Sequence, residues 1–157
     1  RINKDDSRIG QVLEFMKDKI IYLIASEHLK GFANGFANQI NENAKAISDF
    51  RIISELNHHL MEGLANPGYF KEKAGFIFLK SKLYSTRIQE RFDLTKEVVE
   101  KQSIKTIDLE LKGPDKLCQV LEGFVISGYS TYYLSKYYGV DPIKIPWVDY
   151  FKEKLSR

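Results

Sequence analysis

Residues 20–25 read Ile-Ile-Tyr-Leu-Ile-Ala, a continuous run of apolar and largely β-branched side chains. Such a run is typical of a strand that is covered on both faces, as in a parallel sheet. The segment that follows, roughly Lys30 to Ser48, has the period of an amphipathic helix. Its apolar stripe consists of Ala33, Ala37, Ile40, Ala44 and Ile47. A buried strand followed by such a helix indicates a sheet with helices packed against it.

The same alternation of short apolar runs and amphipathic segments continues in both directions along the chain. Further strands are expected at Phe50–Leu56, Gly75–Lys80 and Ser103–Leu109. Further helices are expected at Ser7–Lys17, His58–Leu64, Thr86–Lys101, Pro114–Tyr138 and Trp147–Leu155, the first with Ser7 near its cap. This order predicts an α/β fold, a three-layer α-β-α sandwich around a parallel, doubly wound sheet. Residues 1–157 are expected to form one domain.

Composition excludes several classes of protein. With 43% hydrophobic and 13% aromatic residues, the chain of 157 residues can bury a core and is not a disordered chain. A net charge of +3 is too small to argue for a nucleic-acid partner. The apolar runs are too short to cross a membrane, so no membrane partner is expected. The single cysteine, Cys118, is expected to be a buried thiol, which suits a reducing cytoplasm.

A line of polar residues runs along the helix expected at Lys30–Ser48. Asn34, Asn38 and Glu42 are spaced at i, i+4 and i+8, and Lys45 follows three residues later, so the four share one face. Asparagine is a mediocre helix former, which suggests another reason for its presence. A partly covered glutamate on this face could act as a base. The alternative is a solvated helix face with a weak Glu42–Lys45 pair.

A second polar segment, Ser54 to His59, follows directly after an expected strand. Asn57 can cap the next helix, which would place His58 in its first turn, where an imidazole could transfer protons near neutral pH. The alternative is an ordinary exposed pair of histidines. His58 or His59 with Glu62 could supply two metal ligands, but a third at motif spacing is missing, so no metal is expected. Nucleotide fingerprints are also absent, so no cofactor is expected.

Two larger groups of residues have plainer explanations. Basic side chains in the middle third are interspersed with acidic ones and are expected to form a solvated face. They are Lys71, Lys73, Lys80, Lys82, Arg87 and Arg91, among Glu72, Glu90 and Asp93. Tyrosines at helical spacing near the C-terminus are expected in the core or at a subunit interface. They are Tyr129, Tyr132, Tyr133, Tyr137 and Tyr138.

Three segments together resemble one family. They are NQINENAK (residues 38–45), SELNHHLMEG (residues 54–63) and YYLSKYYGVDPIKIPWVDYFKEKL (residues 132–155). Their order and spacing are similar to the C-terminal domain of the bifunctional phosphoglucose/phosphomannose isomerases of the sugar isomerase (SIS) superfamily. The resemblance spans about residues 20–155. It implies one SIS domain, the C-terminal half of a cytoplasmic enzyme whose N-terminal SIS domain carries a Ser/Thr-rich phosphate loop.

The resemblance also implies an activity. The expected reaction interconverts glucose 6-phosphate and mannose 6-phosphate with fructose 6-phosphate through a cis-enediol. Glu42 would move a proton between C1 and C2, and His58 would assist ring opening across a homodimer interface. Lys152, in a D-x-x-K pattern, would reach the sugar, and Asn38 and Asn57 are candidate substrate-binding residues. An isolated 157-residue half is expected to have little or no activity.

Two departures from the family pattern leave alternatives open. Ile145 stands where a hydroxyl or amide is expected to contact substrate, and residues 31–36 lack the basic or large polar residue expected there. One alternative is a non-catalytic SIS domain that binds a sugar phosphate or only mediates dimerisation. Another is a nucleic-acid-binding module, which has only the diluted basic residues in its favour.

Overall fold

The computed structural model describes residues 6–156. Its sheet contains four parallel strands, β1 (Ile20–Ala25), β2 (Ser48–Ile52), β3 (Ala74–Ser81) and β4 (Lys105–Leu111), in the order β2-β1-β3-β4. From β1 the chain moves to one side to form β2 and to the other side to form β3. This reversal defines a doubly wound sheet. The predicted α/β fold is therefore confirmed.

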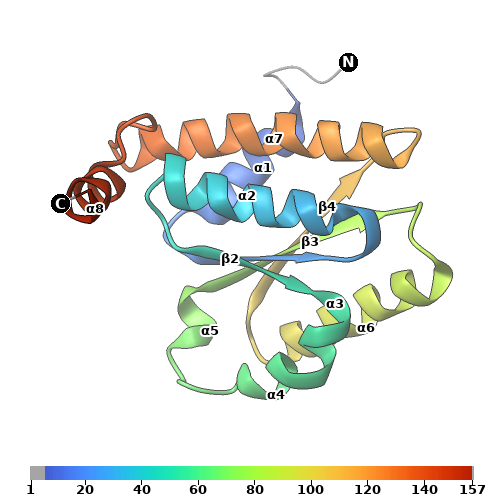
Figure 1. Ribbon diagram of the computed structural model, residues 1–157. Coiled ribbons are helices and arrows are strands. Elements are labelled where there is room, and N and C mark those ends of the chain that lie inside the picture. Colours follow the sequence, from blue (N-terminus) through green and yellow to red (C-terminus); the bar gives the residue numbers. More distant parts are fainter. Residues whose placement is uncertain (1–5, 157) are drawn as a thin grey trace.

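Helices cover both faces of the sheet, as Figure 1 shows. One face carries α1 (Ser7–Met16), α2 (Lys30–Asn43) and α7 (Lys116–Tyr137). The other face carries α3 (Ile53–Glu55), a π-helical turn η2 (Leu56–Leu60), α4 (Met61–Gly63), α5 (Phe70–Lys73) and α6 (Thr86–Lys101). A short 3₁₀ turn, η1 (Glu27–Leu29), leads from β1 into α2. Helix α8 (Pro146–Leu155) projects away from the body beyond the end of α7.

The core lies on both faces of the two central strands, β1 and β3. Every residue of β3 except Lys80 is buried, which agrees with the covering of a parallel sheet on both faces. Large aromatic side chains fill the two layers. Phe78 of β3 meets Phe92 of α6 edge-on at 6.0 Å between ring centroids, and Phe32 of α2 packs against Phe36 and Phe124 on the other face. This packing fixes where α2 and α6 lie over the sheet.

The bounds predicted around β2 are wrong. The strand occupies Ser48–Ile52 rather than Phe50–Leu56, and the chain turns helical from Ile53. Helix α2 ends at Asn43 rather than Ser48, because Lys45 adopts a left-handed conformation with φ of 56°. Ile47, expected on the buried stripe, is consequently 70% exposed. The connection from α2 to β2 is thus longer than periodicity indicates, residues 44–47 rather than residue 49 alone.

The first turn of α1 ties the helix to the rest of the fold. Its N-cap is Asp6, directly before Ser7, and the Asp6 carboxylate accepts hydrogen bonds from the Arg8 backbone and guanidinium. Arg8 also pairs with the buried Glu122 of α7 at 2.6 Å. Glu122 in turn accepts the backbone N–H groups of Lys112 and Gly113 at 2.7 Å each. The hydrogen bond from the Arg8 guanidinium lowers the pKa of Asp6 below 3.8.

This pKa shift predicts how stability changes in acid. A depressed carboxyl pKa contributes stability that is fully present above 3.8 and is lost as pH falls through the folded-state pKa. The urea midpoint of the wild-type chain should therefore fall more steeply below pH 4 than that of Asp6→Asn, whose amide keeps the cap but has no charge to titrate. Chemical denaturation between pH 7 and pH 2.5 measures the difference. Parallel curves for the two proteins would contradict the role assigned to Asp6.

Two other sequence expectations meet different outcomes. Cys118 is half-buried rather than buried, because its neighbours Leu117 and Leu121 point outward from α7. The basic residues of the middle third are mixed with acids: the Lys80 ammonium, for example, lies 2.7 Å from the Asp93 carboxylate and 3.4 Å from that of Asp108.

None of the helices within residues 6–156 has both the length and the apolar character needed to cross a membrane.

Candidate functional site

The C-terminal end of α2 opens into a hollow of about 810 Å³, here called the Glu42 hollow. Its walls come from α2, from the turn before β2 and from α8. The lining residues are Asn38, Asn41, Glu42, Lys45, Ala46, Ile47, Ile145, Pro146, Trp147, Val148 and Lys152. Three of the residues singled out in the sequence, Asn38, Glu42 and Lys152, therefore share one hollow although 110 positions separate the last two.

Charged side chains of both signs line the Glu42 hollow. Glu42 is exposed at the end of α2, and the side chains of Lys45 and Lys152 line the same space. Two ammonium groups can hold an anion or stabilise a developing oxyanion, while the carboxylate can accept a proton. Lys45 donates to the backbone carbonyl of Glu42 rather than to its carboxylate. The Glu42 side chain is therefore not engaged by the lysine that the sequence pattern offered as its partner.

The position of Glu42 depends on its neighbour Asn41. The Asn41 amide donates to the Ser48 carbonyl at 3.0 Å and accepts from the Ser48 N–H at 2.8 Å, so it pairs with the first residue of β2 as a strand would. Ser48 continues the connection by donating from its hydroxyl to the Ile21 carbonyl of β1 at 2.9 Å. These bonds fix the end of α2 against the sheet and thereby set the direction of Glu42.

Replacement of Asn41 tests this connection. Asn41→Ala removes both bonds to Ser48 and should lower the free energy of unfolding by about 1–3 kcal/mol. Asn34→Ala, on the same helix, removes only the weak 3.3 Å hydrogen bond with Asn38. It should change the free energy of unfolding by less than about 0.5 kcal/mol. Urea denaturation of both variants supplies the comparison. Equal stability of the two would show that the Asn41 pairing contributes nothing.

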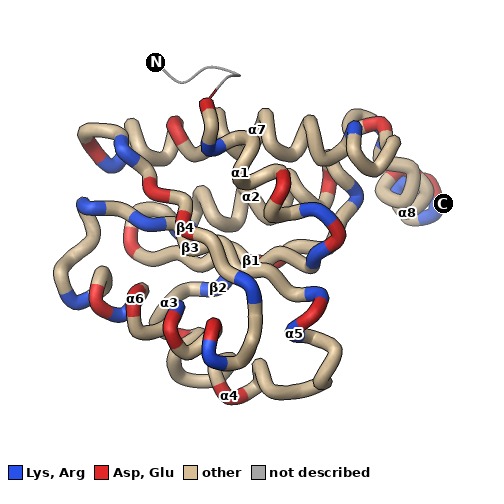
Figure 2. The backbone as a smooth tube through the Cα atoms, turned by 180° about the vertical axis from the view of Figure 1, so that it is seen from behind, with Lys and Arg blue, Asp and Glu red and all other residues tan. Residues whose placement is uncertain are grey.

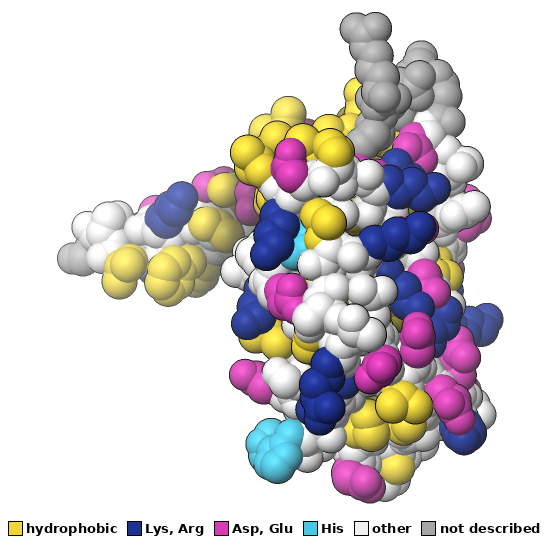
Figure 3. Space-filling view, turned by 90° about the vertical axis from the view of Figure 1, so that its right-hand side faces the viewer, with side chains coloured by type: hydrophobic (Ala, Val, Ile, Leu, Met, Phe, Trp, Pro, Cys, Tyr) yellow, Lys and Arg dark blue, Asp and Glu magenta, His cyan; other side chains and the backbone are white. Residues whose placement is uncertain are grey.

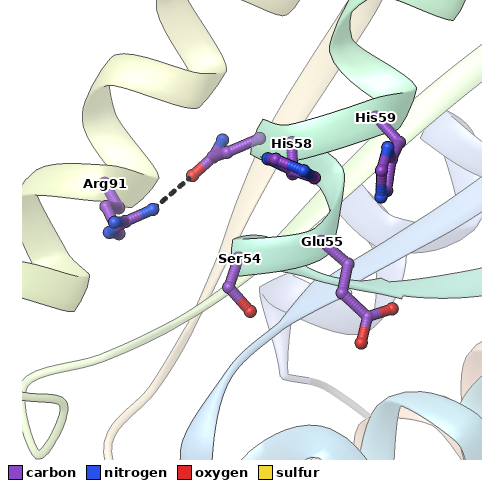
Figure 4. A pocket seen from close by; sticks show the side chains of 6 residues that line it. Ser54, Glu55, His58, His59 and Arg91 are labelled. Atoms are coloured by element: carbon purple, nitrogen blue, oxygen red, sulfur yellow. Dashed lines mark hydrogen bonds between the residues drawn. The ribbon is translucent and has the colours of Figure 1, made fainter.

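His58 lies in a second hollow of about 460 Å³, here called the His58 hollow (Figure 4). It is lined by Ser54, Glu55, Asn57, His58, His59 and Arg91. The two histidines are exposed and their rings meet edge-on, with centroids 4.3 Å apart. Both lie on the π-helical turn η2, and π-helical turns occur frequently at functional sites.

Asn57 does not cap a helix, contrary to the sequence prediction. Helix α3 already begins at Ile53, so Asn57 lies inside a continuous helical segment. Instead, both polar atoms of its side chain form hydrogen bonds with α6. The Asn57 Oδ1 accepts from the Arg91 guanidinium at 3.3 Å, and the Asn57 Nδ2 donates to the Thr95 hydroxyl at 2.5 Å. Thr95 is buried and donates in turn to the Arg91 carbonyl at 2.6 Å. These contacts attach the turn that carries His58 to α6.

Arg91 lines the candidate site and was not singled out from the sequence. The sequence pattern groups it with the diluted basic residues, yet its guanidinium lines the His58 hollow and points toward the segment that carries the histidines (Figure 4). No local pattern connects Arg91 with Asn57, because they are 34 positions apart and meet only through the packing of α6 beside η2. The sequence therefore contained no signal that could have identified it.

The two hollows lie at opposite ends of β2. Asn41, next to Glu42, pairs with the first residue of this strand, whereas the segment that carries His58 starts directly after its last residue, Ile52. Figure 1 shows the same separation between the end of α2 and the α3 region. One chain therefore does not bring Glu42 and His58 together.

The carboxyl edge of the sheet beside the entry to α2 is occupied by the protein's own side chains. His28 meets the Gln119 oxygen at 2.8 Å, and Ser81 donates to the same oxygen at 2.6 Å. Glu27 accepts the Ser85 N–H at 3.1 Å. Among residues 6–156, no three His, Cys, Asp or Glu side chains gather closely enough to hold a metal ion.

Comparison with known proteins shows which family the chain resembles over most of its length. The family model described as the bacterial phospho-glucose isomerase C-terminal SIS domain matches residues 6–155. The bifunctional phosphoglucose/phosphomannose isomerase of Pyrobaculum aerophilum is 32% identical over 145 residues, which cover 92% of this chain and 42% of that protein. The protein of the same name from Aquifex aeolicus is 27% identical over 125 residues, which cover 80% of this chain and 39% of that protein.

A solved structure agrees in fold. The glucose-6-phosphate isomerase like protein from Thermus thermophilus superposes with a TM-score of 0.69 at 19% identity, over 88% of this chain and 46% of that one. The chain thus spans less than half the length of these relatives. The sheet order, the helical layers and the match over residues 6–155 lead to one conclusion. The chain belongs to the family of bacterial phospho-glucose isomerase C-terminal SIS domains.

Proposed function

We propose that this chain supplies the proton-transfer half of an aldose–ketose isomerase that interconverts glucose 6-phosphate or mannose 6-phosphate with fructose 6-phosphate. The observation that supports this most is the Glu42 hollow, in which one carboxylate and two lysines line the same space at the end of a helix that is hydrogen-bonded to the sheet. The matched relatives are named bifunctional phosphoglucose/phosphomannose isomerases, and the proposed substrates follow from those names.

The chemistry needs one base that works on two adjacent carbons. In the proposed step, the Glu42 carboxylate removes the C2 proton of the open-chain aldose while the C1 carbonyl oxygen gains a proton, which gives a cis-enediol. The same carboxyl group then returns its proton to C1 as the C2 hydroxyl loses its own, which gives the ketose. Lys152 stabilises the negative charge that develops on the substrate oxygens, and Asn38 donates to a substrate hydroxyl.

Ring opening is assigned to His58 from a second copy of the chain. An imidazole can protonate the ring oxygen or accept the anomeric hydroxyl proton near neutral pH. Because His58 and Glu42 lie at opposite ends of β2, a homodimer is needed to combine the two hollows into one site. The Asn57 side chain is hydrogen-bonded to Arg91 and Thr95. In this proposal it therefore orients the turn that carries His58 and does not bind the sugar itself.

The phosphate group is assigned to the N-terminal SIS domain. The chain covers only 39% and 42% of the two relatives' lengths, so a second half of comparable size would supply the phosphate loop. The 157-residue chain alone should therefore show little or no turnover, while the full-length protein, expressed from the reading frame extended upstream, should interconvert the three sugar phosphates. Coupled assays on both proteins measure this. Robust turnover by the shorter chain would contradict the assignment.

A non-catalytic domain that binds sugar phosphate is the second candidate. Ile145 favours it, because an apolar side chain lines the Glu42 hollow where a polar group is expected to contact the substrate. Calorimetric titration of the full-length protein with fructose 6-phosphate, combined with NMR in deuterated water, separates the two candidates. Binding accompanied by exchange of the substrate C–H protons supports the isomerase, and binding without exchange supports the non-catalytic domain.

A further inference from the structure

Lysines gather at the amino edge of the sheet, where the four parallel strands begin. Lys19 directly precedes β1, Lys73 directly precedes β3, and Lys105 is the first residue of β4. Lys45 lies in the connection that leads from α2 into β2. The strand order β2-β1-β3-β4 therefore arranges them as a row of Lys45, Lys19, Lys73 and Lys105, here called the lysine row. Figure 2 shows basic residues, in blue, down the right-hand side of the molecule from the level of α2 to that of α5.

The lysine row is not neutralised by the protein's own acids. Within residues 6–156, none of its four ammonium groups forms an ion pair with a carboxylate. Lys19 donates instead to the backbone carbonyls of Phe15 and Lys17, at 2.9 and 3.3 Å. Lys45 donates to the backbone carbonyl of Glu42. The positive charge of this edge is therefore available to a ligand.

The opposite edge of the sheet balances its charges. Figure 3 looks onto the side of the molecule at which the strands end, and there basic and acidic side chains lie side by side. The Lys80 ammonium, at the end of β3, lies 2.7 Å from the Asp93 carboxylate. The ammonium of Lys82 lies 3.8 Å from the Glu110 carboxylate. The carboxyl edge thus pairs its lysines with carboxylates, whereas the amino edge does not.

Three lysines of the row line one hollow of about 440 Å³, here called the amino-edge hollow. Lys19, Lys45 and Lys73 supply its positive charge, and Ile20 and Val140 belong to its apolar lining. A volume of this size is in the range of sites for small molecules. Apolar walls strengthen the field of the charges that they enclose. The amino-edge hollow therefore suits a compact anion.

The other polar groups of the amino-edge hollow add a hydrogen-bond donor. Asp18 is the one acid that lines it within the described residues, and its carboxylate accepts from the Tyr137 hydroxyl at 2.8 Å. The Asp18 N–H donates to the Tyr138 hydroxyl at 2.8 Å, which leaves this hydroxyl its own proton to donate into the hollow that Tyr138 lines. Burial, and then the positive charge of Lys105, lower the pKa of the Lys19 ammonium. A bound anion would offset the repulsion between these two lysines.

We propose that the amino-edge hollow binds a small metabolite that carries a phosphate group, held by Lys19, Lys45 and Lys73. Ammonium groups are common partners of phosphate in proteins. Three lysines and the single acid Asp18 leave two positive charges in excess, which is about the charge that a phosphate monoester balances at neutral pH. The site is separate from the one assigned above to the phosphate of the substrate, and it does not rest on the proposed isomerisation.

The amino-edge hollow adjoins the Glu42 hollow. Lys45, Ala46 and Ile47 line both of them. A phosphate group in the amino-edge hollow therefore engages an ammonium group that also borders Glu42. Binding of the metabolite is thereby linked to the charge of the candidate site, which makes the metabolite an effector rather than a substrate.

The test titrates inorganic pyrophosphate into the ¹⁵N-labelled 157-residue chain and follows the amide signals by NMR. Sodium chloride at the same ionic strength is the reference titration. Pyrophosphate, unlike chloride, should move the signals of residues 18–20, 42–46 and 72–74 along saturable curves. Lys73→Glu should weaken this binding at least about tenfold, because it replaces an attraction with a repulsion at close range.

Lys71→Glu is the matched control. Lys71 lies on the same helix, α5, and is exposed like Lys73, but it does not line the amino-edge hollow. Its replacement changes the net charge equally and should leave the affinity for pyrophosphate within about twofold of wild type, since salt screens a charge outside the hollow. Thermal unfolding verifies that both variants are folded. In the full-length protein, calorimetry should find one more pyrophosphate site per chain in Lys71→Glu than in Lys73→Glu.

Three results would overturn the inference. The first is a response to pyrophosphate no larger than the response to chloride, because the effect would then be screening alone. The second is equal weakening of binding by Lys73→Glu and Lys71→Glu, which would assign it to general surface charge. The third is the same number of sites in both full-length variants. None of these measurements involves turnover, so their failure is distinguishable from a failure of the proposed isomerase.

Discussion

Glu42→Gln in the full-length enzyme should abolish exchange of the substrate C2 proton with solvent and lower kcat by about 10²–10⁴-fold, the range attributed to a positioned general base. The amide has nearly the shape of the carboxylate but cannot accept the proton. Because Glu42 is exposed and Lys45 bonds its backbone rather than its side chain, folding should be unaffected. Proton exchange in deuterated water, followed by NMR, measures the effect directly.

Glu72→Gln is the matched control for this prediction. Glu72 is an exposed glutamate on α5, and it lines neither the Glu42 hollow nor the His58 hollow. Its replacement removes the same charge and should leave kcat within about twofold of wild type, since isolated surface substitutions have small effects. If Glu42→Gln exchanged the C2 proton at the wild-type rate, Glu42 would have no place in the mechanism.

His58→Ala should slow turnover of the cyclic sugar phosphate by about 10²-fold or more, the lower end of what an acid–base group contributes. An open-chain substrate bypasses ring opening, so its turnover should fall far less. The neighbouring His59 supplies the control, because it is also exposed and its ring lies 4.3 Å from that of His58. His59→Ala should slow both substrates little and equally. An equal loss on cyclic and open-chain substrates in His58→Ala would argue against ring opening.

Local patterns predicted the fold well because each depends on neighbours in the sequence. The apolar run Ile20–Ala25 forms β1 as expected, and Asn38 and Glu42 share a face because the helical period places them there. The end of α2 could not be predicted from periodicity. It is set by the pairing of Asn41 with Ser48 and by the left-handed Lys45, whereas the apolar pattern continues to Ile47.

The candidate site was predictable only in part, because several of its residues meet through long-range packing rather than through neighbours in the sequence. Lys152 reaches the Glu42 hollow because the turn after α7 brings α8 to the C-terminal end of α2, a long-range arrangement that only the resemblance to a family suggested. The π-helical turn at Leu56–Leu60 changes the hydrogen-bonding period, which no apolar pattern records. The contacts of Asn57 with Arg91 and Thr95 depend on how α6 packs, so the sequence alone suggested a helix cap instead.

The sharing of one site by two chains is most directly tested by mixing two inactive proteins. Full-length Glu42→Gln and His58→Ala are combined in equal amounts under conditions that exchange subunits, and isomerase activity is followed. In a mixed dimer, one site receives Glu42 from one chain and His58 from the other, so random pairing should restore about a quarter of wild-type activity. If the mixture stays as inactive as its components although mixed dimers have formed, the two residues do not meet across the subunit interface.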